Sequence, residues 1–143
     1  ELELKVVYDE DAVLREVVAA EPRLMRLRER LRGSSEDATY YDRIRLGELV
    51  AEGVERARAA RADRILEALR PYAVELRVAD EVPERVALKA SFLVEEDAVA
   101  RFERAAEDVA AEAAPAYKCH LFGPLPPFSF VELDDLAEAA WAS

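Results

Sequence analysis

Hydrophobic and polar positions alternate in four short segments of the chain, which is the pattern of half-buried β-strands. The segments are residues 2–8, 74–79, 86–94 and 117–122. In the third, one predicted face carries only apolar side chains, namely Val86, Leu88, Ala90, Phe92 and Val94. About six residues around Pro83 separate the second and third segments, which predicts a β-hairpin.

Between the first two strand segments the hydrophobic spacing becomes helical over residues 12–20, 22–32 and about 38–70. Asp9 and Asp11 favour the start of the first helix, and Gly33-Ser34-Ser35 predicts a break before the third. A helix of the third segment's length spans roughly 50 Å, more than a small sheet covers. We therefore expect part of it to pack on the 22–32 helix as a helical hairpin, or on further chain.

A fourth helix is predicted after the third strand. Three acidic residues, 95–97, occupy its first turn, Phe102 lies on its apolar stripe, and Pro115 ends it. The element order is then β-α-β-β-α-β, which is typical of the ferredoxin-like arrangement. The fold class is α+β, with a four-stranded antiparallel sheet of order 4-1-3-2 and an enlarged helical first crossover.

Residues 123–131 form a proline-rich arm after the last strand. Prolines fix φ and favour extended backbone, so such a segment loses little entropy when it docks. Its candidate docking or interaction residues are Gly123, Pro124, Leu125, Pro126, Pro127, Phe128 and Phe130. Two uses remain open: the arm straps its own domain closed, or it binds another surface.

The charge of the chain is strongly negative and uneven. The net charge of the 143 residues is −11, with −2 in residues 1–71 and −9 in residues 72–143. Such a surface repels nucleic acid and anionic membrane, and it suits a partner with a basic face. The 22–32 helix instead carries five arginines. They form either a basic face for an acidic partner or a surface whose arginines pair with nearby acids.

Candidate chemistry is sparse. Cys119 and His120 are the only cysteine and histidine, and as strand neighbours they point to opposite faces, so they form no Cys–His pair. One cysteine suits a reducing cytoplasm. Tyr40 and Tyr41 either line a pocket or take core and helix-packing roles. No glycine-rich phosphate loop or metal-ligand spacing is present, so we expect no cofactor and no enzymatic activity.

The arm also carries a family resemblance. Gly-Pro-Leu-Pro-Pro-Phe-Ser-Phe, residues 123–130, resembles the signature Gly-Pro-Trp-Pro-Pro-Tyr-Ser-Phe of the gas vesicle GvpL/GvpF family. Leu125 stands in place of the Trp and Phe128 in place of the Tyr, so both polar groups are lost and the apolar character stays. Residues 4–8 and 89–97 are similar to the family as well.

The resemblance implies a gas vesicle accessory or minor structural protein that binds the hydrophobic shell subunit and assists vesicle nucleation and assembly. Its partners would be the shell protein and other accessory proteins, with neither nucleic acid nor membrane, and self-association is a further hypothesis. Its place would be the gas vesicle, in the cytoplasm. Two alternatives remain: a small-ligand-binding or enzymatic ferredoxin-like domain, and a generic protein-interaction module.

The element order and the resemblance together give the expected domain limits. Residues 1–131 form the ferredoxin-like domain, with a helical insertion at about 22–70 and the arm at 123–131. Residues 132–143 form a tail with a short helix. The chain would correspond to the C-terminal part of a family member, without the N-terminal α/β domain.

Overall fold

The computed structural model describes residues 1–32 and 40–131. The elements, in order, are β1 (Leu2–Tyr8), α1 (Glu10–Ala20), α2 (Pro22–Arg32), α3 (Tyr40–Leu69), η2 (Arg70–Tyr72), β2 (Glu75–Val78), β3 (Val86–Leu93), η3 (Glu96–Ala98), α4 (Val99–Ala113), β4 (Tyr117–Phe122) and η4 (Phe128–Phe130). The predicted β-α-β-β-α-β order is confirmed. The predicted break at Gly33-Ser34-Ser35 and the predicted helix in 132–143 lie outside the described residues.

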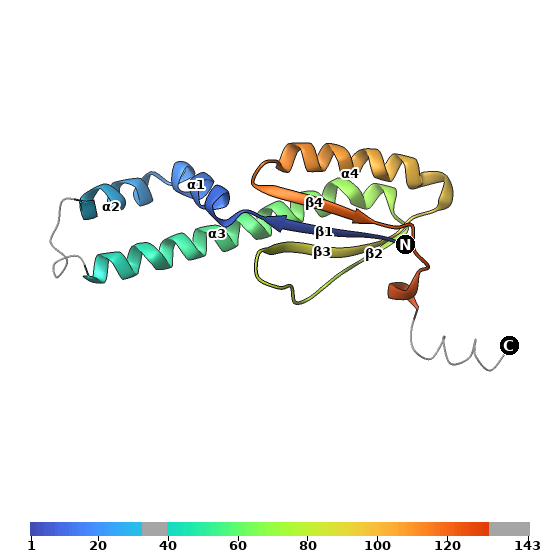
Figure 1. Ribbon diagram of the computed structural model, residues 1–143, viewed down its shortest axis with the longest axis horizontal. Coiled ribbons are helices and arrows are strands. Elements are labelled where there is room, and N and C mark those ends of the chain that lie inside the picture. Colours follow the sequence, from blue (N-terminus) through green and yellow to red (C-terminus); the bar gives the residue numbers. More distant parts are fainter. Residues whose placement is uncertain (33–39, 132–143) are drawn as a thin grey trace.

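The four strands form one antiparallel sheet of order β2-β3-β1-β4, which confirms the predicted strand order. Helix α4 and the C-terminal half of α3 cover one face of this sheet (Figure 1). No α-helix among the described residues covers the other face, and the short 3-10 helix η4 lies at one end of it. The fold is therefore a two-layer α+β structure with an open sheet face.

The core lies between the sheet and the helices. Its centre is the contact between Phe92 of β3 and Phe102 of α4, whose ring centroids are 5.0 Å apart at an interplanar angle of 57°. Both side chains are fully buried, as are Leu4 of β1 and Leu69 of α3. Burying side chains of this size stabilises the fold by roughly 1.5–3 kcal/mol each.

A β-bulge interrupts the central strand pair. Val6 faces Leu88, whereas Val7 faces Val86, so Ala87 is the extra residue. The core cluster includes Ala87 but not Val86, which corrects the predicted placement of Val86 on the face of Leu88. The carbonyl of Ala87 accepts a hydrogen bond of 3.1 Å from Nη1 of Arg58 on α3. The bulge thereby joins the sheet to the long helix.

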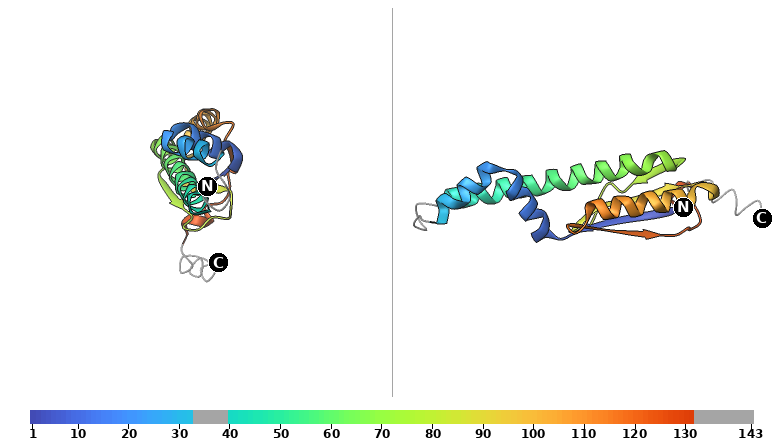
Figure 2. Two further views of the ribbon diagram at one scale, coloured as in Figure 1. Left: turned by 90° about the vertical axis from the view of Figure 1, so that its left-hand side faces the viewer. Right: turned by 90° about the horizontal axis from the view of Figure 1, so that it is seen from above.

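The predicted helical hairpin is confirmed. Helix α2 packs beside α3, and this pair extends beyond the end of the sheet (Figure 2). Leu24 and Leu27 of α2 are buried in the contact. The N-terminal end of α3 differs from expectation, because Tyr40 and Tyr41 are exposed and contact each other edge to face at 5.4 Å. Of the alternatives for these two residues, packing in the core is therefore wrong. Within the described ranges, no helix combines the length and apolarity needed to cross a membrane.

Candidate functional site

The arm leaves β4 through a glycine that no other residue replaces easily. Gly123 has φ +117°, in the region that side chains other than glycine avoid. A Cβ built on Gly123 would lie 2.7 Å from the main-chain oxygen of Glu1 and 3.2 Å from Cδ2 of Leu2. The two backbones therefore approach each other closely at this point, where the arm passes the start of β1.

Two main-chain hydrogen bonds then tie the arm to the first residue described. The Glu1 nitrogen donates to the carbonyl of Leu125 at 2.7 Å, and the Leu125 N–H donates to the carbonyl of Glu1 at 2.7 Å. This reciprocal pair extends the ladder between β1 and β4 past its last sheet partners, Glu3 and Phe122. The arm is thus an irregular continuation of the sheet.

The side chain of Glu1 makes a second attachment, to Ser129. The Ser129 N–H donates to Oε1 at 2.9 Å and the hydroxyl donates to Oε2 at 2.8 Å. Burial raises the pKa of the Glu1 carboxyl. Three other influences lower it and outweigh burial: the two hydrogen bonds from Ser129, a hydrogen bond with Glu3, and the positive charge of the nearby amino group. The pKa of this carboxyl therefore lies below its usual value. The carboxylate form therefore favours docking.

The end of the arm is a short helical turn. Phe128 N–H donates to the carbonyl of Pro126 at 2.8 Å, and Phe130 N–H donates to that of Pro127 at 3.1 Å. The extended geometry expected from the prolines therefore stops before η4. The guanidinium carbon of Arg77 on β2 lies 5.5 Å from the centroid of the Phe130 ring, a cation–π distance. The turn is held against the helix-free face of the sheet.

The predicted arm residues fall into two groups. Leu125 and Phe128 are 44% and 68% exposed, and the prolines are exposed as well, whereas Phe130 is half-buried. Phe122, which ends β4, is 51% exposed and adds a third large apolar side chain. The arm is thus fastened by its backbone and by Ser129 while it shows apolar side chains to solvent. Glu1, Arg77 and Phe122 were absent from the sequence-based set.

Beyond the arm, the open sheet face carries a row of basic side chains. Lys5 of β1 is the direct partner of Lys89 on β3 and of His120 on β4. Lys118 lies two residues from His120 on the same face, opposite Val7. We call Lys5, Lys89, Lys118 and His120 the basic row. Sequence reasoning missed it, because the cluster exists only after strand pairing.

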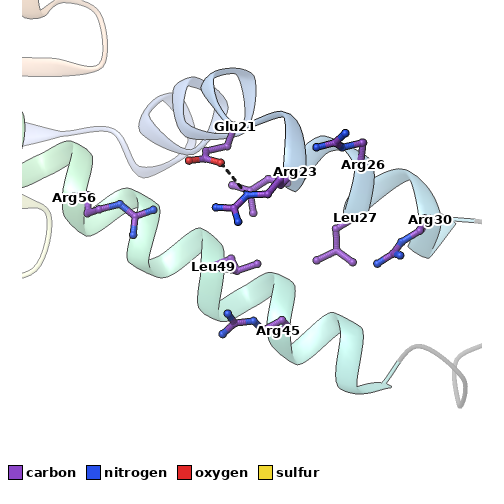
Figure 3. Close-up of a pocket in the computed structure, with 9 residues that line it drawn as sticks. Glu21, Arg23, Arg26, Leu27, Arg30, Arg45, Leu49 and Arg56 are labelled. Atoms are coloured by element: carbon purple, nitrogen blue, oxygen red, sulfur yellow. Dashed lines mark ion pairs between the residues drawn. The ribbon is translucent and has the colours of Figure 1, made fainter.

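A second candidate lies between α2 and α3 (Figure 3). This groove, of about 490 Å³, has Leu24, Leu27 and Leu49 along it; its other lining residues are Glu21, Arg23, Arg26, Arg30, Arg45 and Arg56. Arg23 pairs with Glu21 at 3.8 Å, and Arg45 pairs with Glu48 at 3.3 Å. The five arginines predicted to surround the α2 stripe thus split between this groove and the outer surface of the hairpin.

Cys119 and His120 point to opposite faces of β4, as predicted. Cys119 is half-buried on the core side and His120 is exposed. Burial raises the pKa of the Cys119 thiol, against a smaller opposing effect of Arg61. In the part of the chain that the structure describes, no group of three or more His, Cys, Asp or Glu side chains is placed to hold a metal ion.

Comparisons with known proteins agree on one family. Residues 1–132 match the family described as "Gas vesicle synthesis protein GvpL/GvpF". Gas vesicle protein F of Streptomyces sp. (strain CB03234) is 39% identical over 132 residues, which cover 92% of this chain and 54% of that protein. The chain therefore spans about half the length of this relative.

Two solved structures share the fold. The crystal structure of GvpF from Anabaena sp. PCC7120 matches with a TM-score of 0.79 at 17% identity, over 92% of this chain and 53% of that one. GvpF from Microcystis aeruginosa matches with a TM-score of 0.67 at 17% identity, over 92% and 54%. At this identity the two matches establish the architecture alone.

Proposed function

Because the chain belongs to the GvpL/GvpF family of gas vesicle synthesis proteins, we propose that it is a gas vesicle accessory or minor structural protein. It binds the hydrophobic shell subunit and assists the nucleation and assembly of the vesicle. Other accessory proteins share this work, and its place is the gas vesicle within the cytoplasm. The proposed role is one of contact, not of catalysis.

The docked arm is the observation that carries this proposal. Exposed apolar side chains on a flexible segment lose much entropy when they bind, whereas a segment held by hydrogen bonds is already ordered. Leu125 and Phe128 are exposed on a segment that Glu1 fastens at Leu125 and at Ser129. An apolar shell subunit is the kind of partner that such side chains suit.

The charge of the chain supports the same role. A shell subunit with apolar surface aggregates unless a partner covers that surface until it is incorporated. Because this chain has a net charge of −11, complexes of the chain with a shell subunit repel one another and stay separate. In this mechanism the arm provides the apolar contact, and the acidic surface limits further association.

The test is capture of the shell subunit during co-expression. We expect the full chain to co-purify with the shell subunit. The double variant Leu125→Ala/Phe128→Ala should capture at least about tenfold less of it, which is the effect expected when side chains at the centre of an interface are removed. Tyr40→Ala/Tyr41→Ala removes exposed aromatic surface at the other end of the molecule and serves as the matched control. Absence of capture by the unaltered chain, or equal capture by the arm variant, would contradict the proposal.

A further inference from the structure

All three lysines of the chain and its one histidine lie on the helix-free face of the sheet. Every other basic residue is an arginine. Lys5 is in the middle of this row because β1 is a central strand, with Lys89 on one side and His120 on the other. The row combines residues from three strands on a chain whose net charge is strongly negative.

The basic row has no ion pair within the described residues. Arginines of the helical layer, by contrast, do form ion pairs. Arg58 pairs with Glu55, and both Arg61 and Arg64 pair with Glu112. Like charges placed directly opposite each other in a sheet repel, so the pairing of Lys5 with Lys89 opposes folding. Opposite charge brought by a partner would remove this repulsion, and binding and relief of repulsion would then occur together.

Acidic side chains limit the row at both ends. Glu3 precedes Lys5 on β1 and lies on the same face, beside the arm. At the other end, Lys118 lines a recess with Asp9, Glu10 and Asp11, where Arg85 pairs with Glu10 at 3.7 Å. A long polyanion such as nucleic acid would run over these carboxylates, whereas a short anionic segment fits between them.

We propose that the basic row binds a short acidic segment of a partner polypeptide. The carboxylates of that segment lie over Lys5, Lys89 and His120, and an apolar side chain beside them contacts the exposed ring of Phe122. This site rests on strand register and charge, not on the proposed shell binding by the arm. The arginine-lined groove between α2 and α3 is the competing site, and the test separates the two.

The probe is a fluorescein-labelled oligoglutamate peptide of about ten residues, which spans roughly 33 Å when extended. Fluorescence anisotropy gives its affinity for the full chain, with an oligoglutamine peptide as the uncharged comparison. We expect binding to the glutamate peptide alone. The Debye length shortens to roughly 3 Å at 1 M salt, so we expect binding to weaken strongly as salt is added.

The decisive variant is Lys5→Glu/Lys89→Glu, for which we expect a dissociation constant at least about tenfold higher. Its control is Arg101→Glu/Arg104→Glu, which makes the same change in net charge on exposed positions of α4, on the covered side of the sheet. Lys5→Gln/Lys89→Gln repeats the test without introducing acids. Thermal melting verifies that each variant is folded.

Four results would overturn the proposal. The chain does not bind the oligoglutamate peptide, or the α4 control weakens binding as much as the sheet variant. A third contrary result is that Arg26→Glu/Arg56→Glu abolishes binding whereas Lys5→Glu/Lys89→Glu still binds, which would assign the peptide to the groove between α2 and α3. The fourth is tighter peptide binding when the tail is neutralised by Glu132→Gln, Asp134→Asn, Asp135→Asn and Glu138→Gln. The acidic tail of this chain would then compete with the peptide and would itself be the occupant of the basic row.

Discussion

Gly53 of α3 lies so close to Val17 of α1 that a Cβ at position 53 would stand 2.6 Å from Cγ1 of Val17. Valine has one strongly preferred rotamer in a helix, so its side chain cannot turn away at little cost. The absence of a side chain at Gly53 is what lets α1 approach α3.

Gly47, which lies earlier on the same helix, is exposed, and a Cβ added to it would meet no atom within 4 Å. We therefore expect Gly47→Ala to stabilise the fold by about 1 kcal/mol through helix propensity. Gly53→Ala gains the same propensity but loses about 1–3 kcal/mol to overpacking, so its net effect is zero or destabilising. Urea unfolding of both variants measures the difference. Equal stabilisation at both positions would contradict the close contact.

The Glu1–Ser129 contact predicts a dependence on pH. The pKa of the Glu1 carboxyl is lowered in the folded state, so the stability it adds is present above its unfolded value of 4.5 and is lost as pH falls through the lower folded value. Ser129→Ala removes one of the two hydrogen bonds to the carboxylate. We expect this variant to be less stable by about 1 kcal/mol at neutral pH and equal to the unaltered chain in strong acid.

Melting temperatures recorded between neutral pH and about pH 3 test this expectation. Ser91→Ala is the matched control, because the Ser91 hydroxyl donates to the Ser129 hydroxyl at 3.4 Å, whereas the Glu1 carboxylate is bound by Ser129 itself. Its effect on melting is expected to stay constant with pH. A Ser129→Ala difference that persists unchanged in strong acid would show that the carboxylate does not hold the arm.

The basic row predicts that a charge reversal stabilises the fold. Lys89→Glu converts the repulsion with Lys5 into attraction, for which we expect a gain of about 0.5 kcal/mol. Lys89→Gln removes the repulsion without adding attraction and should gain about half as much. Both gains disappear at high salt because the pair is partly exposed. A destabilised Lys89→Glu variant at low salt would mean that Lys89 has a stabilising partner.

Cys119 gives a prediction about reactivity. The pKa of its thiol is raised by burial, so the reactive thiolate is scarcer near neutral pH than for an ordinary cysteine. We expect alkylation by iodoacetamide at about pH 8 to be several-fold slower in the folded chain than in the same chain unfolded in urea. Equal rates in the two states would contradict the burial of Cys119.

The sequence predicted the sheet well because a strand with one buried face must alternate. Leu88, Ala90 and Phe92 follow one another at every second position, so a single face holds all three. The bulge at Ala87 was not predictable, since Val86, Ala87 and Leu88 are all apolar and the pattern reads the same with or without an extra residue.

The candidate site was predictable only where it is local in sequence. Prolines and aromatic residues identified the arm, because they act on the backbone within a few residues. Glu1 and the basic row depend on which strands pair and in which register, and no spacing in the sequence places Lys5 beside Lys89. Tyr40 and Tyr41 show the converse, because these aromatic residues at the start of α3 are exposed in the structure.

Gly123→Ala separates the two uses of the arm. Alanine at position 123 would adopt an unfavourable φ and place its Cβ against the main-chain oxygen of Glu1, and backbone cannot yield as a flexible side chain does. We expect docking of the arm to weaken by at least about 2 kcal/mol. Because the cluster around Phe92 and Phe102 does not include the arm, the domain itself should stay folded.

Two measurements follow the outcome. Amide shifts in nitrogen–proton NMR spectra should change at Ser91, Arg77 and Ser129, while the core amides stay in place, and capture of the shell subunit should fall, because the apolar side chains of the arm are no longer held in order. Gly47→Ala, at an unconstrained position, controls for the substitution itself. If Gly123→Ala instead unfolds the whole domain, the arm is a strap on which the fold depends, and its exposed side chains need another explanation.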